Sequence, residues 1–395
     1  MAHKNGTGAV AEKLLIKRLK VSGLLSFGPK GIDLPMRGLN VLIGANGSGK
    51  SNLIEILGLL RATARGPLGS DSDWLWKGEG DHAVTEGTVE AVVTNPNGSR
   101  DLRHRLTLFE TRLRLEVADE RIEDAVAPRG KGKGGMHYDF QRGEPVLQSP
   151  AGPQNRKGAI HPGLSILSQV KDAAVYPALA RLESSYNQMR LFRNWQFGPT
   201  SAMRREQSLQ GPNDFLLEDG GENLANVIQD LLLRVRPQLV ASLKMLYDGA
   251  DAIKPTRIGG AIQLFLGEAG GRQIRATRLS DGTLRFLSLL SILLHPQPPP
   301  LVAIEEPELG LHPDLIHHVA DLLKDAATRT QLVITTHSRR LIDEFGSQPE
   351  SVIVCEKEDG ESSFERLDQQ RMKLWLDKYS LGELWSSGQL GGNRW

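Results

Sequence analysis

Residues 39–54 read LNVLIGANGSGKSNLI, and this stretch decides the fold. Its first five residues are almost continuously apolar, which predicts a buried strand. A glycine-rich loop that ends in lysine and serine follows, and apolar residues then recur at helical spacing to about residue 60. A strand, a GxxxxGK[ST] loop and a helix in this order form the structural context in which such a loop binds phosphate groups.

The composition of the loop explains how it would bind a nucleotide. Its three glycines let the backbone turn tightly, so that successive N–H groups point inward at a helix N-terminus. Lys50 would supply a positive charge to the β- and γ-phosphates, and the Ser51 hydroxyl is placed to ligate Mg²⁺. We therefore expect ATP and Mg²⁺ as cofactors. The predicted ATP-binding residues of the loop are Gly44, Ala45, Asn46, Gly47, Ser48, Gly49, Lys50 and Ser51.

A second motif, LVAIEEP at 301–307, is an apolar strand that ends in two acids. Such a strand places carboxylates at the C-terminal edge of an open α/β sheet, where ligands bind. We expect Glu305 to hold the Mg²⁺ or its water and Glu306 to orient the attacking water as a catalytic residue. Read without the loop, the same motif would indicate only a strand and a solvated acidic turn.

Two further motifs flank the acidic strand in the sequence, one before it and one after it. The segment LSDGT at 279–283 opens a helix, with Ser280 as an N-cap candidate and Gly282 allowing close backbone approach. The segment VITTHS at 333–338 places His337 at the end of another apolar strand. A capped helix and a structural histidine are the simpler interpretations of each motif taken alone.

Short runs of valine, isoleucine and leucine alternate with amphipathic helices, which predicts an α/β fold with a largely parallel sheet covered on both faces. Residues 88–117 alternate like an antiparallel β subdomain, and 125–163 have the glycine and proline content of a long loop. Helical patterns resume at 167–190 and 222–248. We expect an N-terminal ATPase lobe at 1–165, an inserted helical lobe at 166–278 and a C-terminal ATPase lobe at 279–395.

Bulk properties exclude several classes of protein. The 395 residues are 39% hydrophobic and 24% charged, and the single cysteine, Cys355, excludes an intramolecular disulfide framework. No apolar run is long enough for a membrane span and no signal peptide is visible, so we expect a cytoplasmic protein without membrane contact. The net charge of +1 does not indicate a globally basic nucleic-acid binder. The basic segment 128–135 fits either a solvated loop or a contact to phosphate backbones.

These motifs together resemble the P-loop core of ABC-type ATPases, in the branch of RecF and SMC. The chain more closely resembles the AAA_21 type of predicted ATPases, related to the ATPase domain of OLD-family proteins. That resemblance implies ATP held between two protomers, with Ser280 and Gly282 contacting the γ-phosphate across the dimer and His337 sensing it as a catalytic residue. It also implies a metal-binding Q-loop glutamine, for which Gln169 is the main candidate and Gln196 the weaker one.

The sequence departs from the patterns of other ABC proteins at two places. Asp281 and Thr283 replace the glycine and glutamine of the transporter-type LSGGQ signature, so the contact across the dimer would be tuned differently. Glu305 stands where most ABC proteins have aspartate, and its extra methylene changes the geometry available to Mg²⁺.

The sequence is compatible with three functions. The first is an ATP-driven homodimer or higher assembly that switches itself or a separate effector, which in proteins of this resemblance includes defence against phage. The second is a RecF-like DNA-binding repair ATPase, supported only by the basic loop at 129–157 and by arginines at 100–114. The third is an OLD-like nuclease, for which the sixty or so residues after His337 offer too little room.

Overall fold

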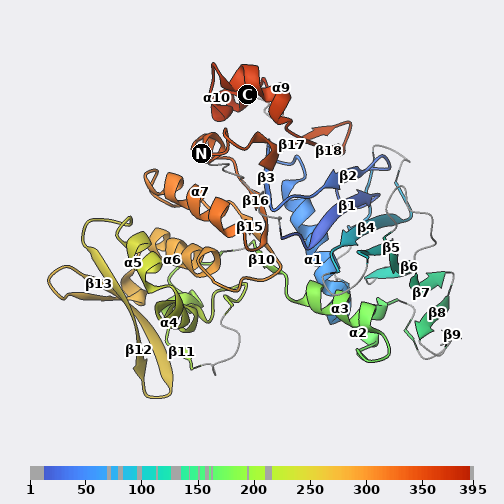
Figure 1. Ribbon diagram of the computed structural model, residues 1–395, viewed down its shortest axis with the longest axis horizontal. Helices are drawn as coiled ribbons and strands as arrows, with labels where there is room; N and C mark the ends of the chain where they lie inside the picture. The colour runs from blue at the N-terminus through green and yellow to red at the C-terminus, as the bar shows by residue number, and fades with distance from the viewer. Residues whose placement is uncertain are drawn as a thin grey trace, which may run out of the picture.

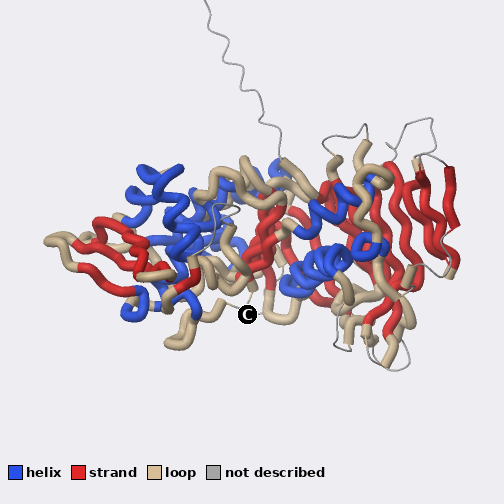
Figure 2. The backbone as a smooth tube through the Cα atoms, turned by 90° about the horizontal axis from the view of Figure 1, so that it is seen from below, coloured by secondary structure: helices blue, strands red, loops and turns tan. Residues whose placement is uncertain are grey.

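The computed structural model describes residues 13–68, 73–78, 83–95, 100–112, 114–125, 135–141, 143–149, 152–155, 160–161, 163–193, 195–209 and 216–391. The described residues form three sheets with helices packed between and beside them (Figure 1). A parallel sheet lies in the middle, a large antiparallel sheet at one end and a mostly helical lobe at the other, and Figure 2 shows the same arrangement from below.

The central sheet has the strand order β10-β15-β16-β3-β17-β18. The first five of these strands run parallel, and β18 pairs antiparallel with β17. Their bounds are β10 (Arg190–Phe192), β15 (Leu301–Glu305), β16 (Gln331–Thr335), β3 (Leu39–Gly44), β17 (Val352–Glu358) and β18 (Glu361–Arg366). Every residue of β3 and β16 is buried, as expected for strands covered on both faces.

Alternate residues of the central strands enter two different cores. Val41 and Ile43 pack with helices α6 (Asp281–Leu293) and α7 (Leu315–Ala326), whereas Leu42 packs with α1 (Lys50–Arg65). Because side chains alternate across a strand, this division shows that the helices cover opposite faces of the sheet. The structure thus confirms the predicted α/β fold class.

The antiparallel sheet has the order β2-β1-β4-β5-β6-β7-β8-β9. Its strands are β1 (Ile16–Ser22), β2 (Ile32–Pro35), β4 (Gly87–Val93), β5 (Leu102–Glu110), β6 (Leu115–Asp124), β7 (Met136–Gln141), β8 (Glu144–Ser149) and β9 (Gly152–Asn155). One face packs into the core that also holds α1, so β4 alternates strictly between buried and half-buried residues. This core fixes the sheet against the helix that follows the glycine-rich loop.

The expectation of a long loop at 125–163 was wrong over the part now occupied by β7, β8 and β9. Tyr138, Phe140 and Leu147 are buried in the core of the antiparallel sheet, and this burial outweighs the local glycine and proline content. The basic residues Arg129, Lys131 and Lys133 of that predicted loop lie outside the described residues.

The segment 166–278 contributes to two parts of the molecule. Helices α2 (Ile166–Gln169) and α3 (Pro177–Asn187) pack on α1, and β10 joins the central sheet. The remaining part is the helical lobe beside α6, with its own small sheet (Figure 1). Its elements are the 3-10 turn η1 (Ala202–Arg204), β11 (Gln207–Ser208), α4 (Leu224–Arg234), α5 (Arg236–Leu243), β12 (Ala250–Ile258), β13 (Ala261–Glu268), β14 (Gln273–Arg275) and η2 (Ala276–Arg278).

The end of the chain packs into the core on the face of the central sheet that also holds α6 and α7. Helix α8 (Arg339–Asp343) follows β16, and η3 (Pro349–Ser351), α9 (Gln369–Leu376) and α10 (Leu381–Ser386) complete the described elements. The Gly382 N–H donates to the Asp343 carboxylate at 2.6 Å, which fixes α10 against α8. Within the described residues, no helix combines the length and the apolar character that a membrane crossing requires.

Candidate nucleotide-binding site

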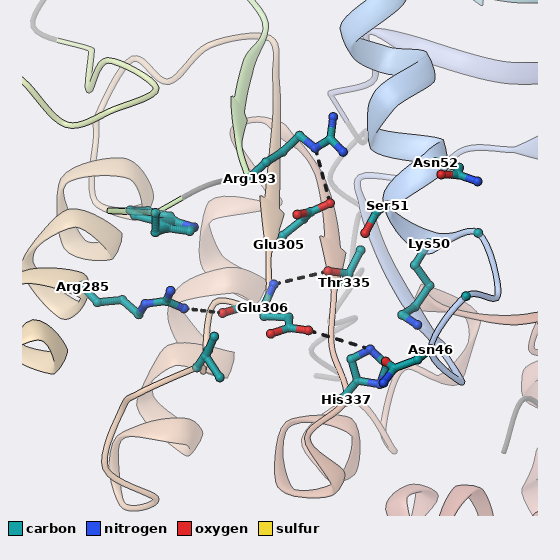
Figure 3. Close-up of a pocket in the computed structure, with 14 residues that line it drawn as sticks. Asn46, Lys50, Ser51, Asn52, Arg193, Arg285, Glu305, Glu306, Thr335 and His337 are labelled. Carbon is teal, nitrogen blue, oxygen red and sulfur yellow. Dashed lines mark hydrogen bonds and ion pairs between the residues drawn. The ribbon is translucent and has the colours of Figure 1, made fainter. Parts of the chain in front are cut away.

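A cavity of about 330 Å³ lies where four parallel strands end (Figure 3). Parallel strands place their C-terminal ends on one edge, so residues far apart in sequence meet there. The cavity is lined by Asn46, Gly47, Gly49, Lys50, Ser51, Asn52, Arg193, Trp195, Arg285, Glu305, Glu306, Leu309, Thr335 and His337.

The glycine-rich loop leaves β3 and enters α1 through backbone conformations that favour glycine. Gly47 and Gly49 have φ angles of 78° and 96°, in the left-handed region. At Gly44 a side chain would collide with the Cys355 carbonyl of neighbouring β17. The local chain therefore turns tightly between strand and helix, as the sequence predicts.

Lys50 points into its own loop. Its ammonium donates to the carbonyls of Gly44 at 2.9 Å and Ala45 at 2.8 Å, and to the Ser48 hydroxyl at 3.4 Å. Burial lowers the pKa of Lys50 below its ordinary value, although Glu306 and Cys355 act in the opposite direction. A positive charge is thus already seated in the space that the loop encloses.

The two acids after β15 have different surroundings. The Oε1 atom of Glu305 is buried without a hydrogen bond and lies 3.5 Å from Nε of Arg193. Glu306 is more exposed, and its carboxylate lies 3.8 Å from Nε2 of His337. The acids therefore present their carboxylates to different neighbours, one toward Arg193 and the other toward His337 (Figure 3).

The backbone of Glu306 is held in a strained conformation by three bonds. Its φ of 45° lies in the left-handed region, which costs a non-glycine residue about 1–2 kcal/mol. Its N–H donates to the carbonyl of Thr335 at 3.0 Å and to its hydroxyl at 3.3 Å. Its carbonyl accepts from Nη1 of Arg285 at 2.8 Å. Strain that is kept by such specific bonds is typical of functional sites.

His337 lies at the end of β16, close to both the loop lysine and Glu306. Burial lowers the pKa of His337, the Lys50 ammonium lowers it further, and Glu306 partly opposes them. The imidazole is therefore neutral at neutral pH.

Ser51 and Glu305 provide a fit for Mg²⁺. Their side chains reach the same part of the cavity from α1 and β15 (Figure 3). Mg²⁺ takes oxygen ligands and usually keeps several waters beside one or two protein ligands and the substrate phosphates. The buried Oε1 of Glu305 has no hydrogen bond, so an oxygen ligand is present that the protein itself leaves unsatisfied.

Ser280 and Gly282 do not line this cavity. Ser280 caps α6, because its hydroxyl accepts from the Thr283 N–H at 3.1 Å. Gly282 lines an adjoining cavity of about 510 Å³, which shares Trp195, Arg285 and Leu309 with the first. Within one chain, the signature segment and the glycine-rich loop therefore face different cavities.

Gln169, which the sequence suggested as a metal ligand, lies away from the cavity. Its amide donates to the carbonyls of Leu164 at 3.0 Å and His161 at 3.1 Å and tightens a local turn. Nearby Lys171 bonds to the carbonyl of Ala64, which lies about 20 Å along α1 from Ser51 at a rise of about 1.5 Å per residue. The weaker candidate, Gln196, lines the adjoining cavity instead.

The sequence did not reveal three features of the cavity lining, which are Arg193, Arg285 and an aromatic stack around Trp195. Trp195 stacks between Phe192 and Phe197 with centroid distances of 5.4 Å each. The Arg285 guanidinium lies over Trp195 at 5.6 Å and over Phe197 at 5.1 Å. The three aromatic residues at 192, 195 and 197 were the available signal, but the strand that pairs with this short segment could not be deduced from it.

The fold and the cavity together define a P-loop NTPase with the architecture of an SMC head. Residues 39–343 match the AAA_21 model, described as "AAA domain, putative AbiEii toxin, Type IV TA system", and the chain belongs to this family. Membership implies nucleotide binding, and the predicted resemblance is confirmed.

Solved structures of SMC heads share the fold. An SMC head bound to the C-terminal winged-helix domain of ScpA has a TM-score of 0.58 at 14% identity, covering 90% of this chain and 99% of that one. SMC heads from Pyrococcus furiosus and Pyrococcus yayanosii give TM-scores of 0.56 and 0.53 at 15% and 12% identity, each covering 92% of this chain and 99% of the other. A comparison with curated proteins finds no match.

Proposed function

We propose that this chain is an ATPase that binds Mg·ATP between two protomers and hydrolyses it to switch a dimer or a partner complex. The observation that carries the proposal is the convergence of Lys50, Ser51, Glu305, Glu306 and His337 on one cavity, although they come from separate parts of the chain. The side-chain types match the demands of phosphoryl transfer, which are charge neutralisation, metal binding and water orientation.

Nucleotide binding would begin with Lys50. The ammonium now bonds to carbonyls of its own loop, and incoming phosphate oxygens offer it stronger, charge-assisted bonds. The N–H groups of the loop would surround the β-phosphate, and Ser51 with Glu305 would hold Mg²⁺, which neutralises charge on the phosphates.

Glu306 would then accept a proton from the attacking water or orient it. The bonds from Thr335 and Arg285 to its main chain fix where the carboxylate stands before ATP arrives. Neutral His337 can donate one hydrogen bond to the γ-phosphate while its other nitrogen accepts one. Such positioning accounts for much of the rate enhancement in phosphoryl transfer.

A second protomer would complete the site. Neither Ser280 nor Gly282 lines the cavity of the loop in their own chain, and Leu309, which lines that cavity, is 56% exposed. An apolar side chain of this exposure beside a charged cavity fits a surface that becomes covered when two copies associate.

The family description, which names a putative toxin of a type IV toxin–antitoxin system, supports a link to such a system. A defence role would follow if ATP turnover controls the output of that system. Neither alternative gains a specific observation. Arg103, in the arginine-rich segment proposed to grip DNA, pairs with Glu90 and Glu123. Among the described residues, no three His, Cys, Asp or Glu side chains are clustered as a nuclease metal site would require.

The test combines turnover with sizing. Lys50→Ala should lose nucleotide binding, whereas Glu306→Gln should bind ATP normally and hydrolyse it about 10²–10⁴-fold more slowly, because the proton acceptor is gone. The Glu306→Gln protein should then accumulate as an ATP-dependent dimer in size-exclusion chromatography. Unchanged turnover together with no ATP-dependent dimer in this variant would disprove the mechanism.

A further inference from the structure

We propose that Arg193 is the resident cation of the metal site and competes with divalent metal for Glu305. In the site without metal, the guanidinium pairs with Glu305. When metal arrives, Arg193 releases that carboxylate and keeps its second partner, Glu55. The inference rests on the proposed function, because it concerns the site that would hold Mg·ATP.

Sheet register places the two residues side by side. Phe192 of β10 pairs with Ile304 of β15, so the next residue of each chain segment, Arg193 and Glu305, emerges at the same level of the sheet edge. Glu305 in turn pairs with Thr335 of β16. The arginine is therefore held next to the metal-binding acid by the strands, and Figure 3 shows its side chain reaching toward Glu305.

The ion pair between Arg193 and Glu305 leaves buried polar atoms without hydrogen bonds. Nε of Arg193 and Oε1 of Glu305 are both buried, lie 3.5 Å apart and make no hydrogen bond. Their side chains are 32% and 18% exposed. Coulombic attraction holds the pair in a partly desolvated place, where it is stronger than in water. A metal ion ligated directly at about 2.0–2.1 Å would satisfy Oε1 better than this longer contact does.

Glu55 gives Arg193 a place to remain after release. It lies on α1 one helical turn beyond Ser51, and its Oε2 is 3.4 Å from Nη2 of Arg193. Arg193 thus bridges the two carboxylates. Loss of one contact leaves the other, so the exchange requires a side-chain movement rather than a rearrangement of the strands.

Competition follows from charge. A divalent ion and a guanidinium within a few ångströms of one carboxylate repel each other, so each weakens the binding of the other. The coupling between the metal and Arg193 is reciprocal. Metal binding weakens the Arg193–Glu305 contact, and this contact weakens metal binding by the same factor. Arg193 therefore sets the Mg²⁺ concentration at which the loaded site forms.

The test measures the Mg²⁺ concentration for half-maximal binding of a fluorescent β,γ-imido ATP analogue. Arg193→Met removes the charge without adding an oxygen ligand, and it should lower that concentration about three- to tenfold, the range of a moderate ion pair. Glu55→Gln should raise it, because Arg193 then pairs with Glu305 alone. Arg193→Lys keeps a cation and should return the midpoint toward that of the wild type.

Arg61→Met is the matched control, since Arg61 lies on α1 beyond Glu55 and pairs with Asp219 instead. It should leave the midpoint unchanged. A midpoint that Arg193→Met leaves unchanged or raises overturns the inference, while the proposed function stands if the wild type still binds the analogue. A wild type that binds no analogue overturns both. Arg193→Met could also bind the analogue more weakly than the wild type in EDTA while its Mg²⁺ midpoint stays unchanged. Arg193 would then be a phosphate ligand, and the proposed competition would be overturned.

Discussion

Single side chains in this site act largely through main-chain groups. Lys50 is held by the carbonyls of its loop, and Glu306 is held by bonds to its own N–H and carbonyl. The bonds to the main chain of Glu306 leave its carboxylate available to substrate, whereas the bonds of Lys50 engage the ammonium itself and would be exchanged for phosphate oxygens. Mutations of the supporting residues should therefore affect hydrolysis more than binding.

Arg285 provides the clearest case. Arg285→Met keeps an unbranched side chain beneath Trp195 but removes the donor to the Glu306 carbonyl. We expect ATP affinity to stay within about twofold and the hydrolysis rate to fall about 10–100-fold, because a small displacement of a catalytic group is costly. Parallel binding and turnover assays check this. Exposed Arg278→Met is the control, and a loss of affinity without a loss of rate would refute the positioning role.

His337 predicts a pH dependence of stability. Burial and Lys50 lower its pKa below the ordinary value of 6.5, so the unfolded chain takes up the proton more readily than the folded protein. Stability from this residue is therefore present above pH 6.5 and is lost as pH falls toward the lower folded pKa. His337→Asn removes this proton uptake. Its Tm should decline less than that of the wild type between about pH 7 and pH 5. Parallel Tm curves in calorimetry would contradict the interpretation.

At the scale of elements, the start of α6 explains an unusual signature residue. Asp281, which stands where the transporter-type LSGGQ signature has glycine, pairs with Arg204 of η1, and Arg204 is 7% exposed. The same guanidinium donates to the carbonyls of Phe197 at 2.9 Å and Leu279 at 2.5 Å. The arginine thus ties the signature segment to the helical lobe and to the aromatic stack.

Arg204→Met should destabilise the protein strongly. It leaves buried carbonyls without donors, and removing one partner of such a buried network costs about 3–5 kcal/mol. A fall in Tm of about 5 °C or more is expected by thermal unfolding. Asp281→Asn should have little effect, because the Asp281 side chain is 65% exposed. Equal losses of Tm in the two variants would show that the buried carbonyl contacts matter less than the ion pair.

Local patterns predicted those elements whose role is encoded within one segment. The strand at 331–335 and the glycine-rich loop were found because their signals are continuous in sequence. The sequence did not show that Gln169 lies away from Glu305. The side chain beside Glu305 is determined by the pairing of three-residue β10 with β15. That pairing joins residues more than 100 positions apart, and no local propensity reports it. The strands at 136–155 were missed for another reason: β7 pairs with β6, the strand directly before it, but the glycine and proline content of the segment indicated a loop.

At the scale of the whole molecule, the central sheet separates two lobes that face different tasks. The antiparallel sheet packs with α1 behind the glycine-rich loop, and the helical lobe packs with α6 behind the signature segment (Figure 1). Under the proposed function, each chain would carry two half-sites, the loop and the signature segment. If two chains associate, each loop would meet the signature segment of the other.

Mixing two inactive variants tests this arrangement directly. Lys50→Ala damages the loop but leaves the signature intact, whereas Ser280→Arg blocks the signature and leaves the loop intact. In a mixed dimer one site combines both intact halves and the other combines both damaged halves. With random exchange of subunits, half of the dimers are mixed, so activity should recover to about a quarter of the wild-type rate. Each variant alone, at the same total concentration, is the control. If the mixture is no more active than the separate variants although sizing shows mixed dimers, the site does not combine residues of two chains.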